Sequence, residues 1–117
     1  MDVTPPFTLW HNPRCSKSRA ALAHLQAAGI EPTLRLYLKE PPSEAEITDL
    51  LSKLSLSPRD MMRRGESIYK DQNLKAADDA TLIKAMVQHP ILIERPILST
   101  PTSAKIGRPT EALDTLL

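Results

Sequence analysis

The chain has 117 residues, a length that predicts a single domain over residues 1–117. Its 15 Lys and Arg residues nearly balance its 14 Asp and Glu residues, which leaves a formal net charge of +1. This balance argues against a general nucleic-acid binder, and aromatic residues at 3% are too few for a base-stacking platform. No apolar run approaches the roughly 20 residues that a membrane helix needs, and residues 1–6 lack the pattern of a signal peptide. Cys15 is the single cysteine, so an intrachain disulfide and a four-cysteine metal site are excluded, and a reducing cytoplasm is the expected location.

The first part of the sequence predicts a strand, a helix and a second strand. Residues 7–10 form a short apolar run typical of a strand, and residues 11–15 form a polar loop broken by a proline. Residues 17–28 are rich in alanine, with two leucines three positions apart, and predict a helix that ends at Gly29. Residues 33–38 alternate as a second strand does. This order is typical of the opening of a parallel sheet.

The middle of the sequence predicts three helical pieces. Ser43 and Glu46 have the spacing of a capping box. An apolar stripe at helical spacing follows them: Ile47, Leu50, Leu51 and Leu54. Residues 57–64 predict a further short helix. Either Asp78 or Asp79 can cap a third helix, whose expected buried stripe is Leu82, Ile83, Met86 and Val87.

The last part of the sequence predicts two strands and a helix. Residues 97–99 and 104–106 form short strands around a turn, and Pro109 fits the first turn of a final helix. The complete order is therefore βαβ, three helical pieces and ββα. Because βαβ followed by ββα is the arrangement of thioredoxin, we expect an α/β thioredoxin-like fold with a helical insertion between its two halves.

Cys15 is the strongest candidate for a chemical role. It lies where the first loop meets the first helix, and free backbone N–H groups and the helix dipole favour negative charge at such a position. A cysteine with an unperturbed pKa of about 8.5 is only roughly 3% thiolate at pH 7, so this location increases its reactivity. The alternative is a buried cysteine that only fills space. The polar neighbours Arg14, Ser16 and Lys17 favour a functional thiol.

His11 and Arg19 lie four residues before and after Cys15. Arg19 falls about one helical turn beyond the cysteine, so its side chain can turn back toward the thiolate. His11 can donate a hydrogen bond to the loop or to the sulfur. Two alternatives stay open, since His11 can simply order the loop and Arg19 can be a solvated charge on the helix surface.

Three further arginines are candidates for binding an oxyanion: Arg63, Arg95 and Arg108. Arg95 precedes Pro96 within an apolar segment, and an arginine in such a segment is rarely buried without an anionic partner. The guanidinium fork matches tetrahedral oxyanions bidentately. The alternatives are a structural ion pair, such as Arg95 with Glu94, and a solvated side chain for Arg63. Thioredoxin-like proteins carry a cis proline that faces the active thiol, but the sequence alone does not assign the isomer of Pro96.

Several separated motifs together resemble the arsenate reductases that work with glutathione and glutaredoxin, within the larger group that includes the Spx-type regulators. The match runs from about Phe7 to the C-terminus. It rests on residues 11–19, on Leu36-Tyr37-Leu38 with Pro41-Pro42, on Met62-Arg63-Arg64, on residues 89–96 and on Ile106-Gly107-Arg108-Pro109.

The resemblance implies a complete reaction. Cys15 would be the nucleophile that attacks arsenate, and His11 and Arg19 would tune the thiol or its loop. The arsenic oxyanion would be held by Arg63, Arg95 and Arg108. Glutathione would be the co-substrate, and glutaredoxin would complete the reduction to arsenite. The resemblance implies no metal and no tightly bound cofactor, and composition and hydropathy predict no nucleic-acid or membrane partner.

One position departs from the pattern of the regulators, which often carry Cys-x-x-Cys where this chain has Ser18. Cys15 then depends on an external thiol. Two other functions stay open, namely a monothiol reductase that uses Cys15 on glutathionylated or other substrates, and an Spx-like protein that binds RNA polymerase. The motif over residues 12–18 is similar to a housekeeping branch of the family, which leaves the physiological substrate open.

Overall fold

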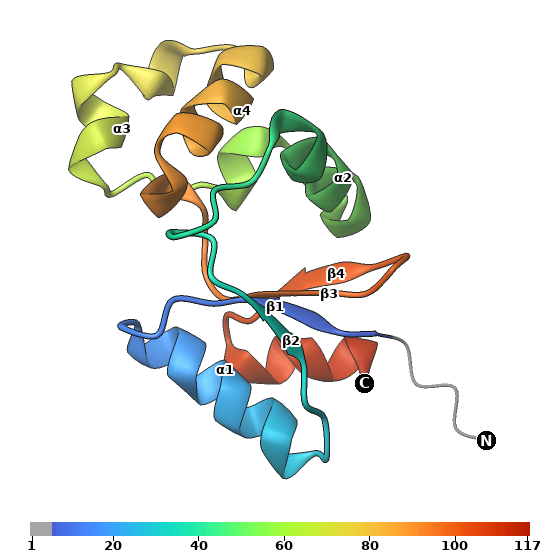
Figure 1. Cartoon of the computed structure of the whole chain (residues 1–117). Coiled ribbons are helices and arrows are strands. Elements are labelled where there is room, and N and C mark those ends of the chain that lie inside the picture. Colours follow the sequence, from blue (N-terminus) through green and yellow to red (C-terminus); the bar gives the residue numbers. More distant parts are fainter. Residues whose placement is uncertain (1–5) are drawn as a thin grey trace. The chain divides into compact units, whose positions relative to one another are not determined.

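The computed structural model describes residues 6–117, which contain short strands and helices (Figure 1). The strands are β1 (Thr8–Trp10), β2 (Thr33–Arg35), β3 (Ile97–Ser99) and β4 (Ala104–Ile106). The α-helices are α1 (Ser16–Ala27), α2 (Glu44–Leu54), α3 (Ser67–Asp71) and α4 (Asp79–Gln88). The 3₁₀ helices are η1 (Pro58–Met61), η2 (Leu74–Ala76), η3 (Pro90–Leu92) and η4 (Thr110–Leu116). The elements form two compact units: the first comprises the described residues up to Leu36 together with Arg95–Leu117, and the second comprises Tyr37–Glu94.

The first unit is built on a four-stranded sheet with the strand order β2-β1-β3-β4. β1 is parallel to β2, with Leu9 opposite Leu34, and antiparallel to β3, with Leu9 opposite Leu98. β3 and β4 form the predicted hairpin, in which the Thr100 N–H donates to the Ser103 carbonyl at 2.7 Å. This arrangement confirms the thioredoxin-like α/β fold, with a helical segment between the two halves.

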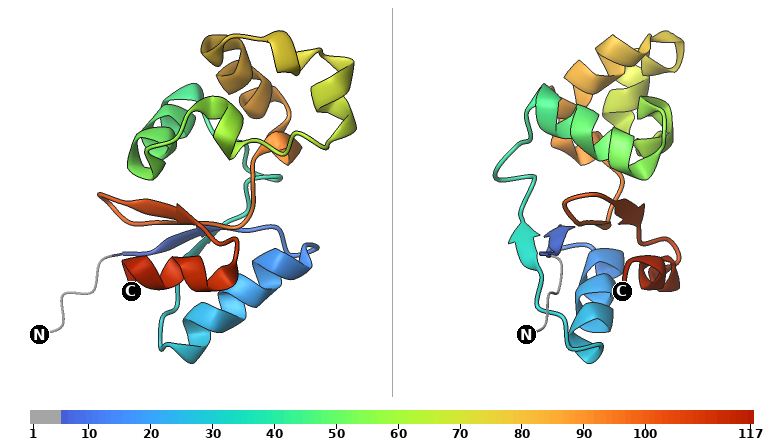
Figure 2. Two further views of the ribbon diagram at one scale, coloured as in Figure 1. Left: turned by 180° about the vertical axis from the view of Figure 1, so that it is seen from behind. Right: turned by 90° about the vertical axis from the view of Figure 1, so that its right-hand side faces the viewer.

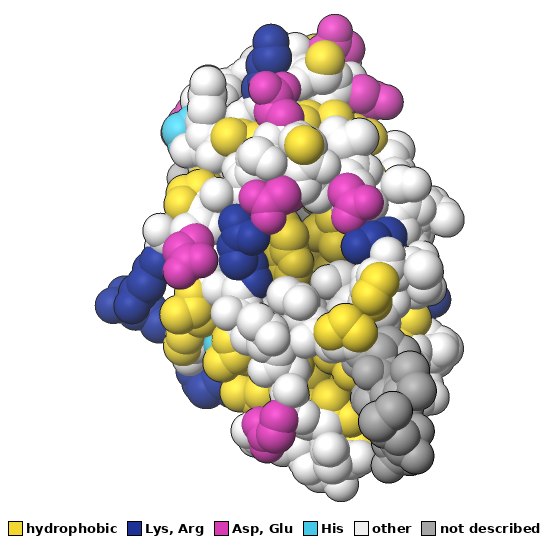
Figure 3. Space-filling view, turned by 45° about the vertical axis from the view of Figure 1, so that its right-hand side comes forward, with side chains coloured by type: hydrophobic (Ala, Val, Ile, Leu, Met, Phe, Trp, Pro, Cys, Tyr) yellow, Lys and Arg dark blue, Asp and Glu magenta, His cyan; other side chains and the backbone are white. Residues whose placement is uncertain are grey.

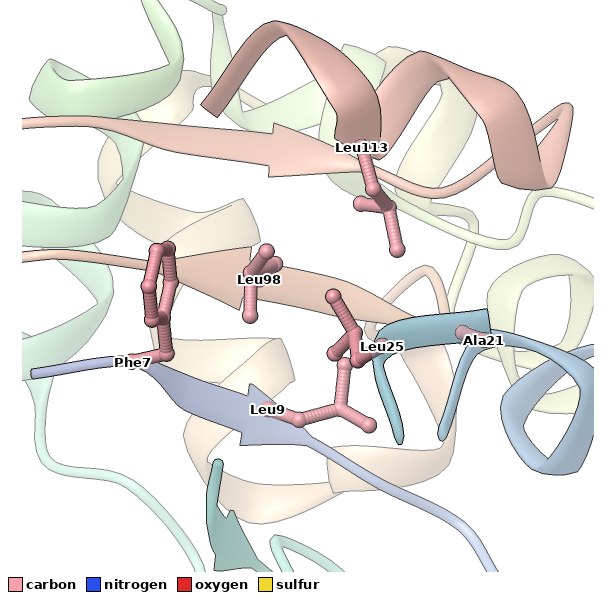
Figure 4. Packing of buried hydrophobic residues seen from close by; sticks show 6 residues of the cluster. All are labelled: Phe7, Leu9, Ala21, Leu25, Leu98 and Leu113. Carbon is pink, nitrogen blue, oxygen red and sulfur yellow. The ribbon is translucent and has the colours of Figure 1, made fainter. Parts of the chain in front are cut away.

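The core of the first unit lies where α1 and η4 cover one face of the sheet (Figures 1 and 2). Six side chains form this core (Figure 4): Phe7, Leu9, Ala21, Leu25, Leu98 and Leu113. Ala21 and Leu25 are one helical turn apart, so the alanine-rich sequence supplies the buried face of α1. Burying a leucine side chain contributes about 1.5–3 kcal/mol. This packing fixes α1 on the sheet and thereby positions the residue that begins it.

The connection from β4 to η4 passes very close to the start of β3. The Gly107 N–H donates to the Pro96 carbonyl at 2.9 Å, and a Cβ at position 107 would lie 3.0 Å from Pro96 Cγ. A larger residue at this position would have to displace the proline ring by a few tenths of an ångström, so glycine favours this approach. The Arg95–Pro96 and Arg108–Pro109 peptide bonds are both cis. The approach also brings two predicted site residues together, because Arg108 Nε donates to the Arg95 carbonyl at 2.7 Å.

The second unit is helical, and its caps agree with the sequence prediction. Ser43 Oγ accepts from the Glu46 N–H, and the Ser43 N–H donates to Glu46 Oε1, both at 3.1 Å. Asp78 rather than Asp79 caps α4, since its Oδ1 accepts from the Thr81 N–H at 2.9 Å. The predicted stripes of α2 and α4 supply five fully or nearly buried side chains: Ile47, Leu50, Leu51, Leu82 and Met86.

Several short elements differ from the prediction. The second strand ends at Arg35 rather than at residue 38, and the helix expected over residues 57–64 is only η1, because Met62 leaves it to form a β-bridge with Ile93. The final helix is of the 3₁₀ type. The elements α3, η2 and η3 were not predicted, since each is too short to show an apolar period.

Arg59 holds the unpredicted part of the second unit together. Its guanidinium donates to Tyr69 Oη at 2.6 Å, to the Leu74 carbonyl at 2.9 Å and to the Ala77 carbonyl at 2.8 Å. These polar contacts fix α3 and η2 in addition to the buried side chains of Tyr69 and Leu74.

Charges of both signs are distributed over the surface. On the face in Figure 3, basic and acidic side chains are interspersed, with hydrophobic side chains between them. The large hydrophobic side chains that are exposed are Leu34, Leu38, Ile91 and Leu117. Within residues 6–117, no helix has the length and apolar character needed to cross a membrane.

Candidate thiol site

Cys15 is the N-cap residue of α1 and is only 8% exposed. Its N–H donates to the Asn12 carbonyl at 3.0 Å, and its own carbonyl accepts from the Arg19 N–H at 3.0 Å. The loop therefore turns directly into the helix at the cysteine. This location brings the sulfur beside the first N–H groups of α1.

The pKa of the Cys15 thiol is lowered from its ordinary value although the residue is buried. Burial is the largest single influence and raises the pKa, because it disfavours the thiolate. The combined effects of the Ser18 N–H, a hydrogen bond from the Arg95 side chain, the Lys17 N–H and the Arg95 charge outweigh it. The sulfur makes no capping hydrogen bond of conventional geometry, so we attribute the effect of the N–H groups to their aligned dipoles. A lowered pKa increases the fraction of the nucleophilic thiolate near neutral pH.

Arg95 is brought to the thiol by the register of the sheet. Trp10 is opposite Ile97 in the antiparallel pair, so the residues that follow β1 lie near the residues that precede β3. The half-buried Arg95 side chain donates a hydrogen bond to Cys15 and also contributes its positive charge. The sequence identified this arginine as a candidate, but it could not decide whether its partner is the Cys15 thiol or Glu94.

Arg108 lies beside Arg95. Its hydrogen bond to the Arg95 carbonyl joins the β4–η4 connection to the segment before β3. The residue is exposed, so its charge lies at the surface of the first unit.

His11 is buried in the first unit and is only 4% exposed. Its backbone N–H donates to the Arg35 carbonyl at 2.9 Å, and its Nδ1 has no hydrogen-bond partner among the described residues. Burial and then the charge of Arg19 lower the pKa of His11. Its ring is consequently neutral at neutral pH and does not supply positive charge to the thiolate.

Arg19 turns back toward the loop, as its position on the helix allows. Its Nη1 donates to the Pro13 carbonyl at 3.0 Å, so its hydrogen bond supports the loop rather than the sulfur.

Two polar residues that the sequence analysis did not assign to the site also shape this loop. The Asn12 N–H donates to Ser18 Oγ at 3.3 Å, and Asn12 Oδ1 accepts from the Arg14 N–H at 3.0 Å. Asn12 and Ser18 are both buried. An asparagine before a proline is a signal for such a side-chain turn, and it could have identified Asn12. Ser18, which stands where the regulators carry a second cysteine, has a structural function here.

Arg63 belongs to the second unit, whereas the other predicted site residues belong to the first. Its guanidinium forms an ion pair with Glu66, and its backbone N–H donates to the Leu92 carbonyl at 2.7 Å. Its assignment to oxyanion binding stays a prediction. Across residues 6–117, no group of three or more His, Cys, Asp or Glu side chains is gathered as a metal site would require.

A thioredoxin-like sheet, a cysteine of lowered pKa at the start of the first helix and an arginine before a cis proline place the chain in the thioredoxin-like fold class. The chain belongs to the ArsC family, because the sequence profile of that family matches residues 10–116.

Relatives match both units of the chain. An arsenate reductase of Neisseria meningitidis is 42% identical over 116 residues, which are 97% of this chain and 99% of the relative. The uncharacterized protein YfgD of Escherichia coli is 45% identical over 112 residues, which are 93% of this chain and 94% of that protein. The structure of an arsenate reductase from Vibrio cholerae has a TM-score of 0.94 and 42% identity, and the match covers 98% of this chain and 100% of that one.

Proposed function

We propose that this protein reduces arsenate to arsenite through a covalent intermediate on Cys15, with electrons from glutathione and glutaredoxin. The observation that carries the proposal is the pairing of a cysteine of lowered pKa with the Arg95 guanidinium. The arsenate reductases of similar length and sequence support the choice of substrate.

The first step joins two negatively charged groups and therefore needs cations. The Cys15 thiolate attacks arsenic, an S–As bond forms, and one As–O bond breaks as its oxygen takes a proton and leaves as water. Arg95 stabilises the thiolate first and then an oxygen of the bound arsenate, while Arg108 beside it adds a second guanidinium. A hydrogen bond to a charged group contributes about 1.5–3 kcal/mol, so two of them make a useful oxyanion site. Arg63 is the third ligand that the resemblance assigns.

The second step supplies two electrons from two thiols. The glutathione sulfur attacks arsenic and forms a new S–As bond, and a second arsenic oxygen takes up the thiol proton and leaves as water. A glutaredoxin thiolate then attacks the glutathione sulfur and forms a mixed disulfide, and the electron pair of the broken S–As bond reduces arsenic from the +5 to the +3 state. Water releases arsenite and returns the thiol of Cys15. Because thiols carry the electrons, the reaction requires no resident cofactor, and the reducing cytoplasm is the proposed location.

His11 and Arg19 act in this proposal by shaping the loop around the nucleophile. A neutral His11 fills the space behind the loop, and Arg19 holds the Pro13 carbonyl. Both are positioning residues for Cys15.

Steady-state arsenate reduction tests the proposal directly. The assay contains glutathione and glutaredoxin and follows NADPH consumption through glutathione reductase. We expect turnover by the wild type, none by Cys15→Ser, and nearly unchanged turnover by the matched variant Ser16→Ala, whose side chain is exposed. Turnover by Cys15→Ser would refute the covalent intermediate.

A monothiol reductase of other substrates is a second candidate, favoured by the buried Ser18 that replaces a resolving cysteine. If this second function is correct, the wild type should reduce glutathione mixed disulfides but should not turn over arsenate. Arg95→Lys separates the two functions, because lysine keeps a positive charge beside the thiolate but loses the planar fork that binds two oxygens of arsenate, so arsenate turnover should fall more than reduction of mixed disulfides.

A further inference from the structure

A cavity of about 270 Å³ opens in the first unit next to the thiol site. Its walls come from the first turn of α1 and from the connection between β4 and η4, and they consist of Lys17, Gly107, Arg108, Pro109, Thr110 and Glu111. The sequence analysis gave Lys17, Thr110 and Glu111 no function.

We propose that this cavity binds the glutathione molecule that supplies the first thiol. The inference rests on the proposed function and deepens it, because it names the binding site of the co-substrate.

The charges of the cavity match those of glutathione. Lys17 and Arg108 contribute two cations, Glu111 contributes one carboxylate, and Thr110 contributes a hydroxyl group. Glutathione carries two carboxylates and one ammonium at neutral pH, which is the complementary set. An inorganic oxyanion offers no partner for Glu111 and would be repelled by it.

The volume of the cavity also favours a small peptide over an oxyanion. Ligand sites commonly measure about 300–1,000 Å³, so this cavity of about 270 Å³ is slightly smaller than that range. A tetrahedral ion with four oxygens occupies roughly 120 Å³ if each oxygen takes the volume of a water molecule. Such an ion would leave more than half of the cavity to solvent.

Two residues connect the cavity to the sulfur of Cys15. The Lys17 N–H helps to lower the pKa of the Cys15 thiol, so the wall that bears the Lys17 side chain begins beside the sulfur. On the other wall, Arg108 is hydrogen-bonded to the Arg95 carbonyl, and the Arg95 side chain bonds to Cys15. A peptide held between Lys17, Arg108 and Glu111 therefore has its thiol close to an arsenic atom on Cys15.

S-methylglutathione is the probe for a test, because its capped sulfur binds without reacting. Titration followed by NMR should shift the amide signals of Gly107, Thr110 and Glu111. Lys17→Gln and Glu111→Gln should each weaken binding about two- to fivefold, as expected for one exposed ion pair. The matched controls Lys105→Gln and Glu31→Gln remove exposed charges elsewhere in the first unit and should bind as the wild type does. Excess inorganic phosphate should compete weakly.

Each outcome bears on one of the two proposals. Absence of binding at millimolar probe, shifts confined to other residues, or equal binding by all variants would overturn the cavity assignment. Displacement by phosphate at equal concentration would overturn it in favour of an oxyanion site. If both cavity variants turn over arsenate with an unchanged KM for glutathione, the proposed glutathione site is refuted but the proposed function is not. If the wild type binds the probe in the cavity but does not turn over arsenate, the proposed arsenate reduction is refuted and the glutathione site is retained.

Discussion

Replacement of Arg95 with glutamine should raise the pKa of the Cys15 thiol. The variant removes both the hydrogen bond and the charge by which Arg95 stabilises the thiolate. Burial, which raises the pKa, remains because the cysteine keeps its place at the start of α1. The N–H groups of Ser18 and Lys17 then have to oppose burial alone.

The size of the effect follows from the exposure of the two groups. A hydrogen bond to a charged group contributes about 1.5–3 kcal/mol, and we take the lower end because the Arg95 side chain is only half-buried. A change of about 1.4 kcal/mol alters the thiolate-to-thiol ratio by a factor of ten. At pH values below the pKa of the wild-type Cys15 thiol, Arg95→Gln should therefore react with iodoacetamide roughly tenfold more slowly than the wild type. At high pH it should react as fast as the wild type or slightly faster, since a thiolate of higher pKa is more nucleophilic.

The assay is the rate of Cys15 alkylation as a function of pH. Arg14→Gln is the matched control, because Arg14 is adjacent to the cysteine but exposed, so water and salt screen its charge. Its profile should nearly coincide with that of the wild type. Equal displacement of both profiles would mean that net charge alone acts on the thiol, and no displacement for Arg95→Gln would refute the hydrogen bond.

The same interaction makes stability depend on pH. Because the folded-state pKa of Cys15 is below its unfolded-state value, the unfolded chain binds more protons between the two values. The contribution of the thiolate is thus complete above the unfolded-state pKa and is lost as pH falls through the folded-state pKa. The free energy of unfolding of the wild type minus that of Cys15→Ser should rise with pH across this window, and the rise should be smaller in the Arg95→Gln background. A flat difference in urea titrations would contradict the lowered pKa.

Three further variants test the loop, a cap and a close contact. Arg19→Gln should raise the pKa of His11, because the Arg19 charge helps to lower it, and an unchanged NMR titration of the ring would contradict this. Ser43→Ala should lower the free energy of unfolding by about 1 kcal/mol in urea titrations through loss of the capping box, and an unchanged value would argue against it. Gly107→Ala should lower it by about 1–3 kcal/mol, because its Cβ would crowd a proline ring at 3.0 Å. Gly65→Ala is the control, since no atom lies within 4 Å of its Cβ position, and equal losses would refute the steric explanation.

The parts of the fold that depend on local signals could be predicted from the sequence. Ser43 and Glu46 form a capping box within four consecutive residues, and the two strands around residues 100–103 need only a turn between them. The position of Cys15 at a helix start is equally local, because it follows from where the alanine-rich helix begins. These features are set by residues that are close in the sequence.

The partners of the arginines could not be predicted, because each is set by tertiary structure. Arg59, which the sequence analysis did not single out, bonds to a tyrosine hydroxyl and two carbonyls. Arg63 pairs with Glu66, three residues away. Arg95 reaches Cys15 across a separation of 80 positions, and the sheet register rather than any sequence pattern brings them together. A guanidinium in an apolar segment indicates that a partner exists but not which one.

The role proposed for Arg95 requires that it stabilise the thiolate and the substrate in turn. As the sulfur bonds to arsenic its charge is lost, and the guanidinium becomes available to the oxygens, so its interaction strengthens during attack. Arg95→Lys separates the two contributions, because lysine keeps the charge but loses the planar fork that binds two oxygens. We expect its alkylation profile to stay close to that of the wild type while kcat/KM for arsenate falls by about tenfold or more, the equivalent of one charge-assisted hydrogen bond. Parallel loss of thiol reactivity and arsenate turnover would mean that Arg95 serves only the thiolate, and unchanged turnover would mean that its charge alone suffices.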